Sequence, residues 1–270
     1  MSGRRRVASL AGELSTKDLA LLRLLEASRF ATTRQLASFT QEGHSSWASA
    51  LRQTSRALQS LTGHGVVVSL ERRIGGRRAG STGLIWALTP AGHRLLDTIT
   101  ERPAGKRYRS ETEPSSTFLN HTLAITETRL RLHQLGATTT IRLAVFDHEP
   151  ASWRRYLAPH GGTTTLKPDA YAVITSPDYE DHYFLEIDCN TEALVIIERK
   201  ALQYQAYRRT VTEQARIGLF PAVVWVTPTE HRAERIRERL ARTPGLSPGL
   251  FTAISIDQLA EHVHTGPASP

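Results

Sequence analysis

The chain has 270 residues and a formal net charge of +8, and this charge is unevenly distributed. Residues 1–110 contain 18 Lys and Arg against 7 Asp and Glu, a net charge of +11, whereas residues 111–270 carry −3. The asymmetry predicts two domains, the first of which binds a polyanion. The single cysteine excludes an internal disulfide framework, and no spacing typical of zinc enzymes occurs. Without an apolar run of about 18 residues or a secretion signal, we expect a cytoplasmic protein that does not bind membranes.

Three helical patterns follow a basic, flexible N-terminus (residues 1–14). Leucines at helical spacing predict a helix over residues 16–28, and TTRQLASF predicts a short helix over 32–39. A third helix starts after Ser45 or Ser46 and stops at Gly63. Its apolar stripe recurs at intervals of four and three residues and predicts the buried face, formed by Trp47, Leu51, Thr54, Leu58 and Leu61.

The opposite face of the third helix is rich in arginine and glutamine and carries no carboxylate. Its members are Ser49, Arg52, Gln53, Arg56 and Gln59. Arginine pairs with guanine edges and glutamine with adenine edges in the major groove of DNA. The pattern therefore predicts a recognition helix for double-stranded DNA.

Two short strands and a basic loop come next. Residues 66–70 and 84–88 are predicted strands, and the Gly-rich loop between them holds Arg72, Arg73, Arg77 and Arg78. A loop of this kind directly after a recognition-type helix predicts a wing that contacts phosphates. With a closing helix at 89–99, residues 15–100 are predicted to form a winged helix-turn-helix domain. The alternative is that these arginines form an ordinary solvated face, but charge, helix order and wing together favour DNA binding.

A polar linker (residues 101–116) leads to a second domain (117–262) and a flexible tail (263–270). The predicted elements are a helix at 116–135, strands at 138–146, 166–174 and 182–188, a helix at 192–209, a strand at 222–227, a helix at 230–241 and a strand at 251–256, with 152–157 a short exposed segment. Strands mixed with crossover helices predict a sheet covered on both faces. The predicted fold class is α/β, α+β overall.

Three carboxylates are expected at one edge of this sheet. Asp169 sits at the start of one strand, and Glu186 and Asp188 end the next. Glu186 and Asp188 have the same parity, so their side chains point to one face. Such carboxylates suit Mg²⁺ or Mn²⁺, which would polarise a phosphodiester and activate a water molecule. Tyr204, on the following helix, is expected to be a packing residue.

These residues resemble the restriction-endonuclease-like superfamily, whose signature is PD…(D/E)xK on an αβββαβ core. Pro168 and Asp169 match its first half, and Glu186 matches the acidic position. Asp188 stands where the resemblance predicts lysine, and Lys200 on the following helix is the substitute it implies. Glu127 would fill the additional acidic position of some members. The implied catalytic set is therefore Asp169, Glu186, Lys200 and Glu127, with Asp169, Glu186 and Asp188 as the metal ligands.

The whole arrangement also resembles the replication-relaxation family of actinobacterial and Gram-positive mobile elements. The segments that carry this resemblance are LTPAGHRLL, FLNHTLAITETRLRL, LKPDAYAVI, LEIDCNTE and ERKALQYQAY, and it covers residues from about 15 to 260. It implies a DNA-associated role in the replication or transfer of a plasmid or integrative element.

The favoured interpretation is a DNA-binding protein whose winged helix delivers a nuclease-like domain to a mobile element. Replication or transfer proteins are further candidate partners, and a homodimer is left open. One alternative is an active Mg²⁺-dependent nickase or endonuclease using Asp169, Glu186 and Lys200. Another is a regulator whose second domain only recruits a protein. A catalytically silent pocket is left open beside the nuclease, with Glu186, Asp188 and Glu192 paired with Lys200, Arg199 and Arg208 in an ion network.

Overall fold

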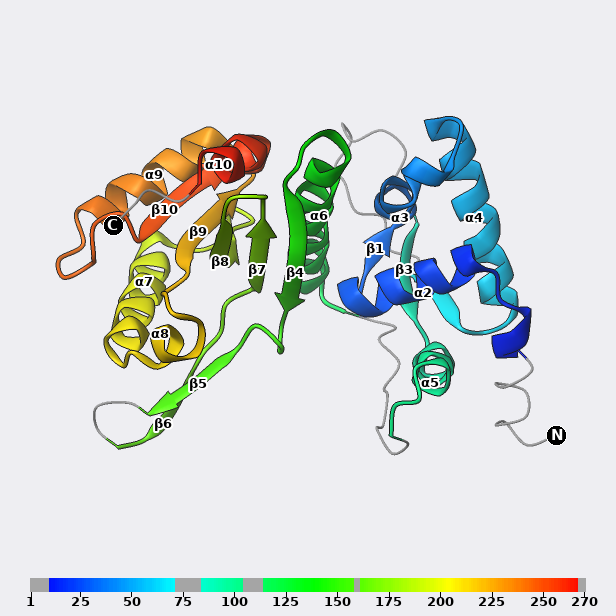
Figure 1. Ribbon diagram of the computed structural model, residues 1–270, viewed down its shortest axis with the longest axis horizontal. Helices are drawn as coiled ribbons and strands as arrows, with labels where there is room; N and C mark the ends of the chain where they lie inside the picture. Colours follow the sequence, from blue (N-terminus) through cyan, green and yellow to red (C-terminus); the bar gives the residue numbers. More distant parts are fainter. Residues whose placement is uncertain (1–9, 71–83, 104–113, 158–160, 267–270) are drawn as a thin grey trace. The chain divides into compact units, whose positions relative to one another are not determined.

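The computed structural model of the chain describes residues 10–70, 84–103, 114–157 and 161–266 (Figure 1). Helices and strands of mixed order build it, so the α/β class predicted from the sequence is confirmed. Within these ranges, every helix is too short or too polar to cross a lipid bilayer.

The chain divides into two units, residues 1–126 and 127–270. The division falls inside helix α6 (Ser116–Thr138) instead of in the predicted linker. The reason is packing, because Leu119 and Leu123 of α6 are buried in one cluster with Phe30 and Ile85 of the first unit. Gln35 also donates a hydrogen bond to the Leu123 carbonyl at 3.1 Å.

The first unit combines helices with a small antiparallel sheet of order β1-β3-β2. Its elements are α2 (Thr16–Ser28), β1 (Ala31–Thr32), α3 (Thr33–Phe39), the short 3₁₀ helix η1 (Gln41–Gly43), α4 (Trp47–Gly63), β2 (Val67–Leu70), β3 (Ile85–Leu88) and α5 (Pro90–Ile99). The helices and the two longer strands occur where the sequence predicts them. The predicted wing loop, with Arg72, Arg73, Arg77 and Arg78, lies outside the described residues.

Side-chain caps fix the starts of these helices. Ser15 and Asp18 form a reciprocal capping box at α2, and Thr32 and Gln35 form one at α3. At α5 a glycine is required: a Cβ on Gly92 would lie 2.1 Å from the carbonyl oxygen of Val66. Only a residue without a side chain lets α5 approach the chain just before β2 this closely.

The second unit is built on a five-stranded mixed sheet of order β10-β9-β8-β7-β4. Its strands are β4 (Arg142–His148), β7 (Ala170–Thr175), β8 (Glu180–Ile187), β9 (Ala222–Thr227) and β10 (Phe251–Ser255). The pairs of β7 with β4 and β8 are antiparallel, and those of β9 with β8 and β10 are parallel. Its helices after α6 are α7 (Leu194–Arg209), α8 (Thr212–Ile217), α9 (Glu230–Ala241), the short η2 (Ile256–Gln258) and α10 (Leu259–Thr265).

Helices cover both faces of this sheet, as predicted. On one face, Tyr204 of α7 and Ile236 of α9 belong to the same buried core as Phe184 and Trp225 of the sheet. On the opposite face, the ring of His262 in α10 packs against Tyr183, with ring centroids 6.0 Å apart. Residues of even and odd number along β8 therefore serve different layers.

The structure adds a two-stranded hairpin between β4 and β7 that the sequence did not predict. It consists of β5 (Arg154–Leu157) and β6 (Thr163–Leu166), which pair in antiparallel register. The segment expected to be merely exposed is thus a strand, with Tyr156 buried and its neighbours on either side exposed. The predicted strand over 166–174 is split, and β7 begins only after Pro168, which has no backbone N–H to donate.

Candidate functional site

One face of helix α4 is buried and the other lies open to solvent. Ala50, Thr54, Leu58 and Leu61 are its buried residues. Trp47 and Leu51 are only half-buried, and Ala50 takes the innermost place instead. This corrects the predicted stripe, whose first two positions are displaced from the core by Ala50.

The predicted recognition residues all lie on the exposed side of α4: Arg52, Gln53, Arg56 and Gln59. Gln53 is held in place, since its Nε2 donates to Ser49 Oγ and its Oε1 accepts from Lys17 Nζ, both at 3.1 Å. Lys17, from the start of α2, therefore adds a third positive charge beside this face. Its sequence position gave no sign of this role, because the two residues are 36 positions apart.

A second cluster forms where β7 and β8 meet. Ala170 pairs with Leu185 across these strands, so Asp169 stands opposite Glu186 one position further on. Asp169 Oδ2 accepts a hydrogen bond from the backbone N–H of Ile187 at 2.6 Å. The sequence therefore placed these two carboxylates correctly on neighbouring strands.

Helix α7 completes this cluster with two side chains one turn apart. Lys200 Nζ lies 2.8 Å from Glu186 Oε2 and 3.0 Å from Glu192 Oε1. The hydroxyl of Tyr204 donates to Glu186 Oε1 at 2.6 Å. Tyr204 is buried, as predicted for a packing residue, but its hydroxyl also orients the carboxylate.

Burial and neighbouring charges set the protonation of this cluster. Burial raises the pKa of Glu186 to about 7, the Asp169 carboxylate adds to the rise, and Lys200 and Tyr204 oppose it. Burial alone would lower the pKa of Lys200, but the surrounding carboxylates raise it above its ordinary value. Burial and Glu186 both raise the pKa of Tyr204. At neutral pH the cluster thus contains a charged ammonium and a protonated phenol around Glu186.

Asp188 does not join the other two predicted ligands. Both of its oxygens accept hydrogen bonds from the buried guanidinium of Arg232, at 2.6 and 3.2 Å. Glu127, the other implied acid, pairs with Arg131 on the next turn of α6 at 3.2 Å. Within the described residues, no three Asp, Glu, His or Cys side chains lie close enough to hold one metal ion. The predicted set of three carboxylates at one ion is therefore not brought together.

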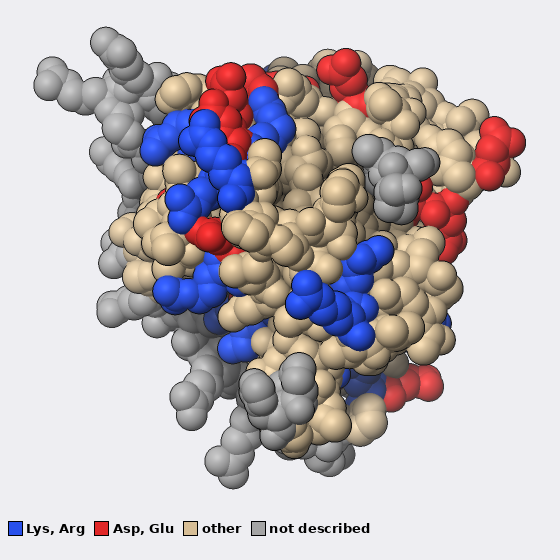
Figure 2. Space-filling view, turned by 90° about the vertical axis from the view of Figure 1, so that its left-hand side faces the viewer, with Lys and Arg blue, Asp and Glu red and all other residues tan. Residues whose placement is uncertain are grey.

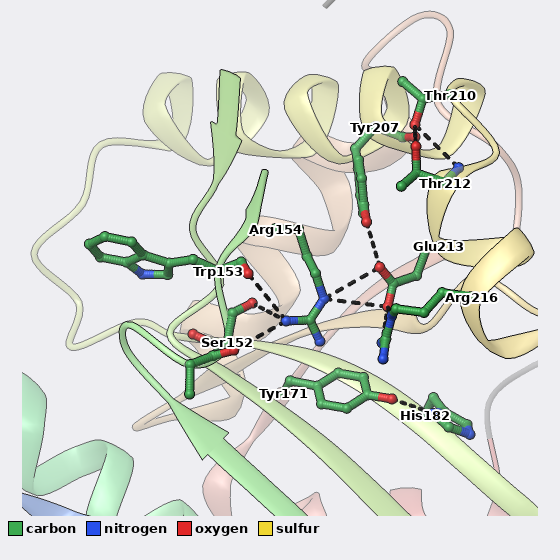
Figure 3. Close-up of polar contacts among 11 residues, drawn as sticks. Ser152, Trp153, Arg154, Tyr171, His182, Tyr207, Thr210, Thr212, Glu213 and Arg216 are labelled. Atoms are coloured by element: carbon green, nitrogen blue, oxygen red, sulfur yellow. Dashed lines mark hydrogen bonds and ion pairs between the residues drawn. The ribbon is translucent and has the colours of Figure 1, made fainter. Parts of the chain in front are cut away.

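A third polar cluster ties the β5–β6 hairpin to the short helix α8 (Figure 3). Glu213, fully buried, accepts from Arg154 Nε at 3.4 Å, from Arg216 Nε at 3.2 Å and from the Tyr207 hydroxyl at 2.5 Å. The guanidinium of Arg154 also lies 4.7 Å from the centre of the Tyr171 ring. None of these contacts was predicted, because they join residues that lie up to 59 positions apart.

Charged side chains on other surfaces are mixed in sign. On the face in Figure 2, blue Lys and Arg groups lie next to red Asp and Glu groups. Helix α9 is an example, since Arg237 pairs with Glu230 at 2.5 Å and Arg242 with Glu238 at 3.8 Å. The exposed face of α4 differs because its sequence contains no carboxylate at all.

The family comparison covers all three clusters. A family model described as replication-relaxation matches residues 22–223. The chain belongs to the replication-relaxation family. Membership indicates a role in the replication or transfer of a plasmid or other mobile element. No match was found among curated proteins.

In this replication-relaxation protein, the matched region runs from α2 into β9. It therefore contains the α4 face, the Asp169–Glu186–Lys200 cluster and Glu213. The resemblance to the replication-relaxation family stated from the sequence is confirmed.

Stability of this replication-relaxation protein should depend on pH through Glu213. Burial opposes ionisation of this carboxyl, but Arg216, Tyr207 and Arg154 lower its pKa below the ordinary value of 4.5. Because the folded-state pKa is the lower one, the stabilising contribution is complete above pH 4.5 and is lost as the pH falls through the folded-state pKa. In urea unfolding between pH 7 and pH 3, a Glu213→Gln protein should show a flatter acid limb than the parent. Parallel acid limbs in the two proteins would contradict this assignment.

Proposed function

We propose that the chain is a DNA-binding protein that acts in the replication or transfer of a mobile element, with α4 as its recognition helix. The observation that carries the proposal is the exposed α4 face, where Arg52, Gln53, Arg56 and Gln59 lie together without a carboxylate. Arginine and glutamine can read base edges in the major groove, and Lys17 beside them can neutralise a phosphate. The opposite face of α4 is buried in the first unit, so the helix is fixed while its exposed face can enter the groove.

The order of elements in the first unit supports a winged helix-turn-helix. A helix, a short strand, two helices and a pair of antiparallel strands follow one another over residues 16–88. In such domains the second helix of the turn enters the major groove, and the loop between the strands follows the backbone. The four arginines of residues 72–78 would supply the phosphate contacts of that loop.

Binding to a random pool of duplexes tests the proposal. The full chain should retain duplex DNA from the pool and enrich a preferred sequence over successive rounds. If Lys17 and the four arginines each contact one phosphate, affinity should fall roughly 500-fold between 50 and 200 mM KCl. A protein that retains no duplex at 50 mM KCl would refute the proposed function.

Metal-dependent cleavage of DNA is a second candidate, favoured by Lys200 beside the two carboxylates. Mg²⁺ in proteins uses one or two carboxylates plus water and substrate phosphate oxygens, so Asp169 and Glu186 would hold it, with Glu186 exchanging its contact with Lys200 or Tyr204 for the ion. When bound, such an ion polarises a phosphodiester and lowers the pKa of an attacking water. Asp188 would not take part, because Arg232 occupies both of its oxygens. The charged Lys200 would stabilise negative charge on the phosphate.

Incubation with supercoiled plasmid and Mg²⁺ or Mn²⁺ tests this second candidate. An Asp169→Asn protein keeps an acceptor for the Ile187 N–H but loses the charge, and its nicking rate should fall roughly 100-fold. Asp178→Asn, at an exposed position of the same unit, is the matched control and should nick like the parent. A parent that neither relaxes nor linearises plasmid at stoichiometric protein would remove this candidate and favour a silent domain.

A further inference from the structure

The β5–β6 hairpin has one face in the core and one in solvent. Tyr156 and Leu166 point inward and belong to the buried core of the second unit. The alternate residues point outward, with Trp153 36% exposed and Leu157 65% exposed. In Figure 3 the indole of Trp153 extends away from Arg154 and Glu213. Other large apolar side chains of the described residues are equally exposed, so what distinguishes this face is the set of charges beside Trp153.

Two positive charges accompany these apolar groups. Lys167 Nζ lies 4.6 Å from the centre of the Trp153 ring, and the Arg155 side chain is exposed on the same face. In the described part of the chain, neither cation forms an ion pair. The Nε1 of Trp153 donates to Glu149 at 3.3 Å, which fixes the edge of the ring and leaves a flat aromatic surface in solvent.

The hairpin is held rigidly beside the Asp169–Glu186 cluster. Arg154 anchors it from the inner side through Glu213 and the carbonyl of Ser152, the latter at 2.9 Å. The Ser152 hydroxyl donates to the Pro168 carbonyl at 2.6 Å, which joins the start of β5 to the residue before Asp169. Lys167 itself is two residues from Asp169. The hairpin is thus joined to the segment that carries Asp169, whereas the Asp169 and Glu186 side chains are themselves buried.

We propose that the outer face of this hairpin binds an unpaired strand of DNA, with Trp153 stacked on a base and Arg155 and Lys167 on phosphates. The inference rests on the proposed action on DNA and adds an unpaired strand to the duplex that α4 is proposed to bind. Aromatic side chains with flanking cations are the usual platform for single strands, because every base has a flat face. Paired bases in a duplex hide those faces, so the exposed indole favours an unpaired strand.

The inference is tested by titrating the full chain into a fluorescently labelled oligonucleotide of twelve thymidine nucleotides. Fluorescence anisotropy reports binding, and EDTA is present to remove divalent metal ions. Trp153→Ala should weaken binding about 5- to 150-fold, and Trp153→Phe should restore most of it. Arg155→Ala/Lys167→Ala replaces two exposed side chains, so the fold should not change, and the variant should bind more weakly and with a shallower salt dependence than the parent. Tyr179→Ala, which removes an aromatic ring that is 40% exposed at the far end of β7, should bind like the parent.

Duplex binding separates failure of this inference from failure of the proposed function. Trp153→Ala should retain the parent's affinity for a selected duplex. A parent that binds this duplex but not the oligonucleotide, or a Trp153→Ala protein with unchanged oligonucleotide affinity, would overturn the inference alone. Loss of a protein partner on Trp153→Ala substitution, with oligonucleotide binding intact, would overturn it in favour of protein recognition. A parent that binds neither DNA refutes the proposed function as well.

Discussion

Replacing Glu213 with alanine is expected to lower the free energy of unfolding by roughly 3–5 kcal/mol, because it leaves a buried positive charge without its partner. The Glu213 side chain is 0% exposed and that of Arg154 is 13% exposed, so water cannot take over the lost contact. The Tyr207 hydroxyl would also lose its acceptor. The hairpin should then detach from α8, since Arg154 is its inner anchor.

Urea unfolding followed by far-ultraviolet circular dichroism measures this effect. Glu238→Ala is the matched control, because Glu238 is 56% exposed and its pair with Arg242 spans 3.8 Å. An exposed pair of this kind contributes at most about 1 kcal/mol. A Glu213→Ala protein as stable as the control variant would show that the cluster in Figure 3 does not hold the hairpin.

An Arg52→Ala/Arg56→Ala protein should bind a selected duplex about 30-fold to 2 × 10⁴-fold more weakly than the parent. Each bidentate contact from arginine to a base contributes about 1–3 kcal/mol, and two such contacts are removed. Both side chains are exposed, so the fold should not change. The variant should also discriminate less between the selected duplex and an unrelated one, because base contacts carry the sequence preference.

A matched loss of charge controls for simple electrostatics. Arg94→Ala/Arg235→Ala removes two exposed arginines, one from α5 and one from α9, and should weaken binding less than tenfold. Titrations at one fixed salt concentration compare the three proteins. Equal affinity of the Arg52→Ala/Arg56→Ala variant and the parent would remove α4 as the recognition helix.

The local pattern of the sequence was sufficient for most elements. The strand at 222–227 and the helix at 230–241 have the bounds predicted, because their periods and caps lie within the elements themselves. The exposed side of α4 was predictable for the same reason. The β5–β6 hairpin was missed because β6 is largely threonine, so its alternation carries little apolar signal.

The candidate site was harder to predict, because several of its side chains form hydrogen bonds or ion pairs with residues far away in the sequence. Strand parity placed Glu186 and Asp188 on one face correctly, but it could not show that Arg232, 44 residues later, takes both oxygens of Asp188. The pair of Lys200 and Glu186 was one of the ion-network pairs that the sequence left open, and the family resemblance placed both residues in one catalytic set. Glu213 lies in a six-residue helix without a strong apolar pattern, so nothing in the sequence pointed to its buried role.

Photo-cross-linking from α4 tests the central claim most directly. Gln59, on the exposed face, is replaced with benzoylphenylalanine, and Thr98, exposed in α5, is replaced likewise in a control protein. Irradiation of each protein bound to a selected duplex should give a covalent DNA adduct from position 59 and little from position 98. A protein that binds the duplex with parental affinity but forms no adduct from position 59 would contradict the account of α4 as the helix that enters DNA.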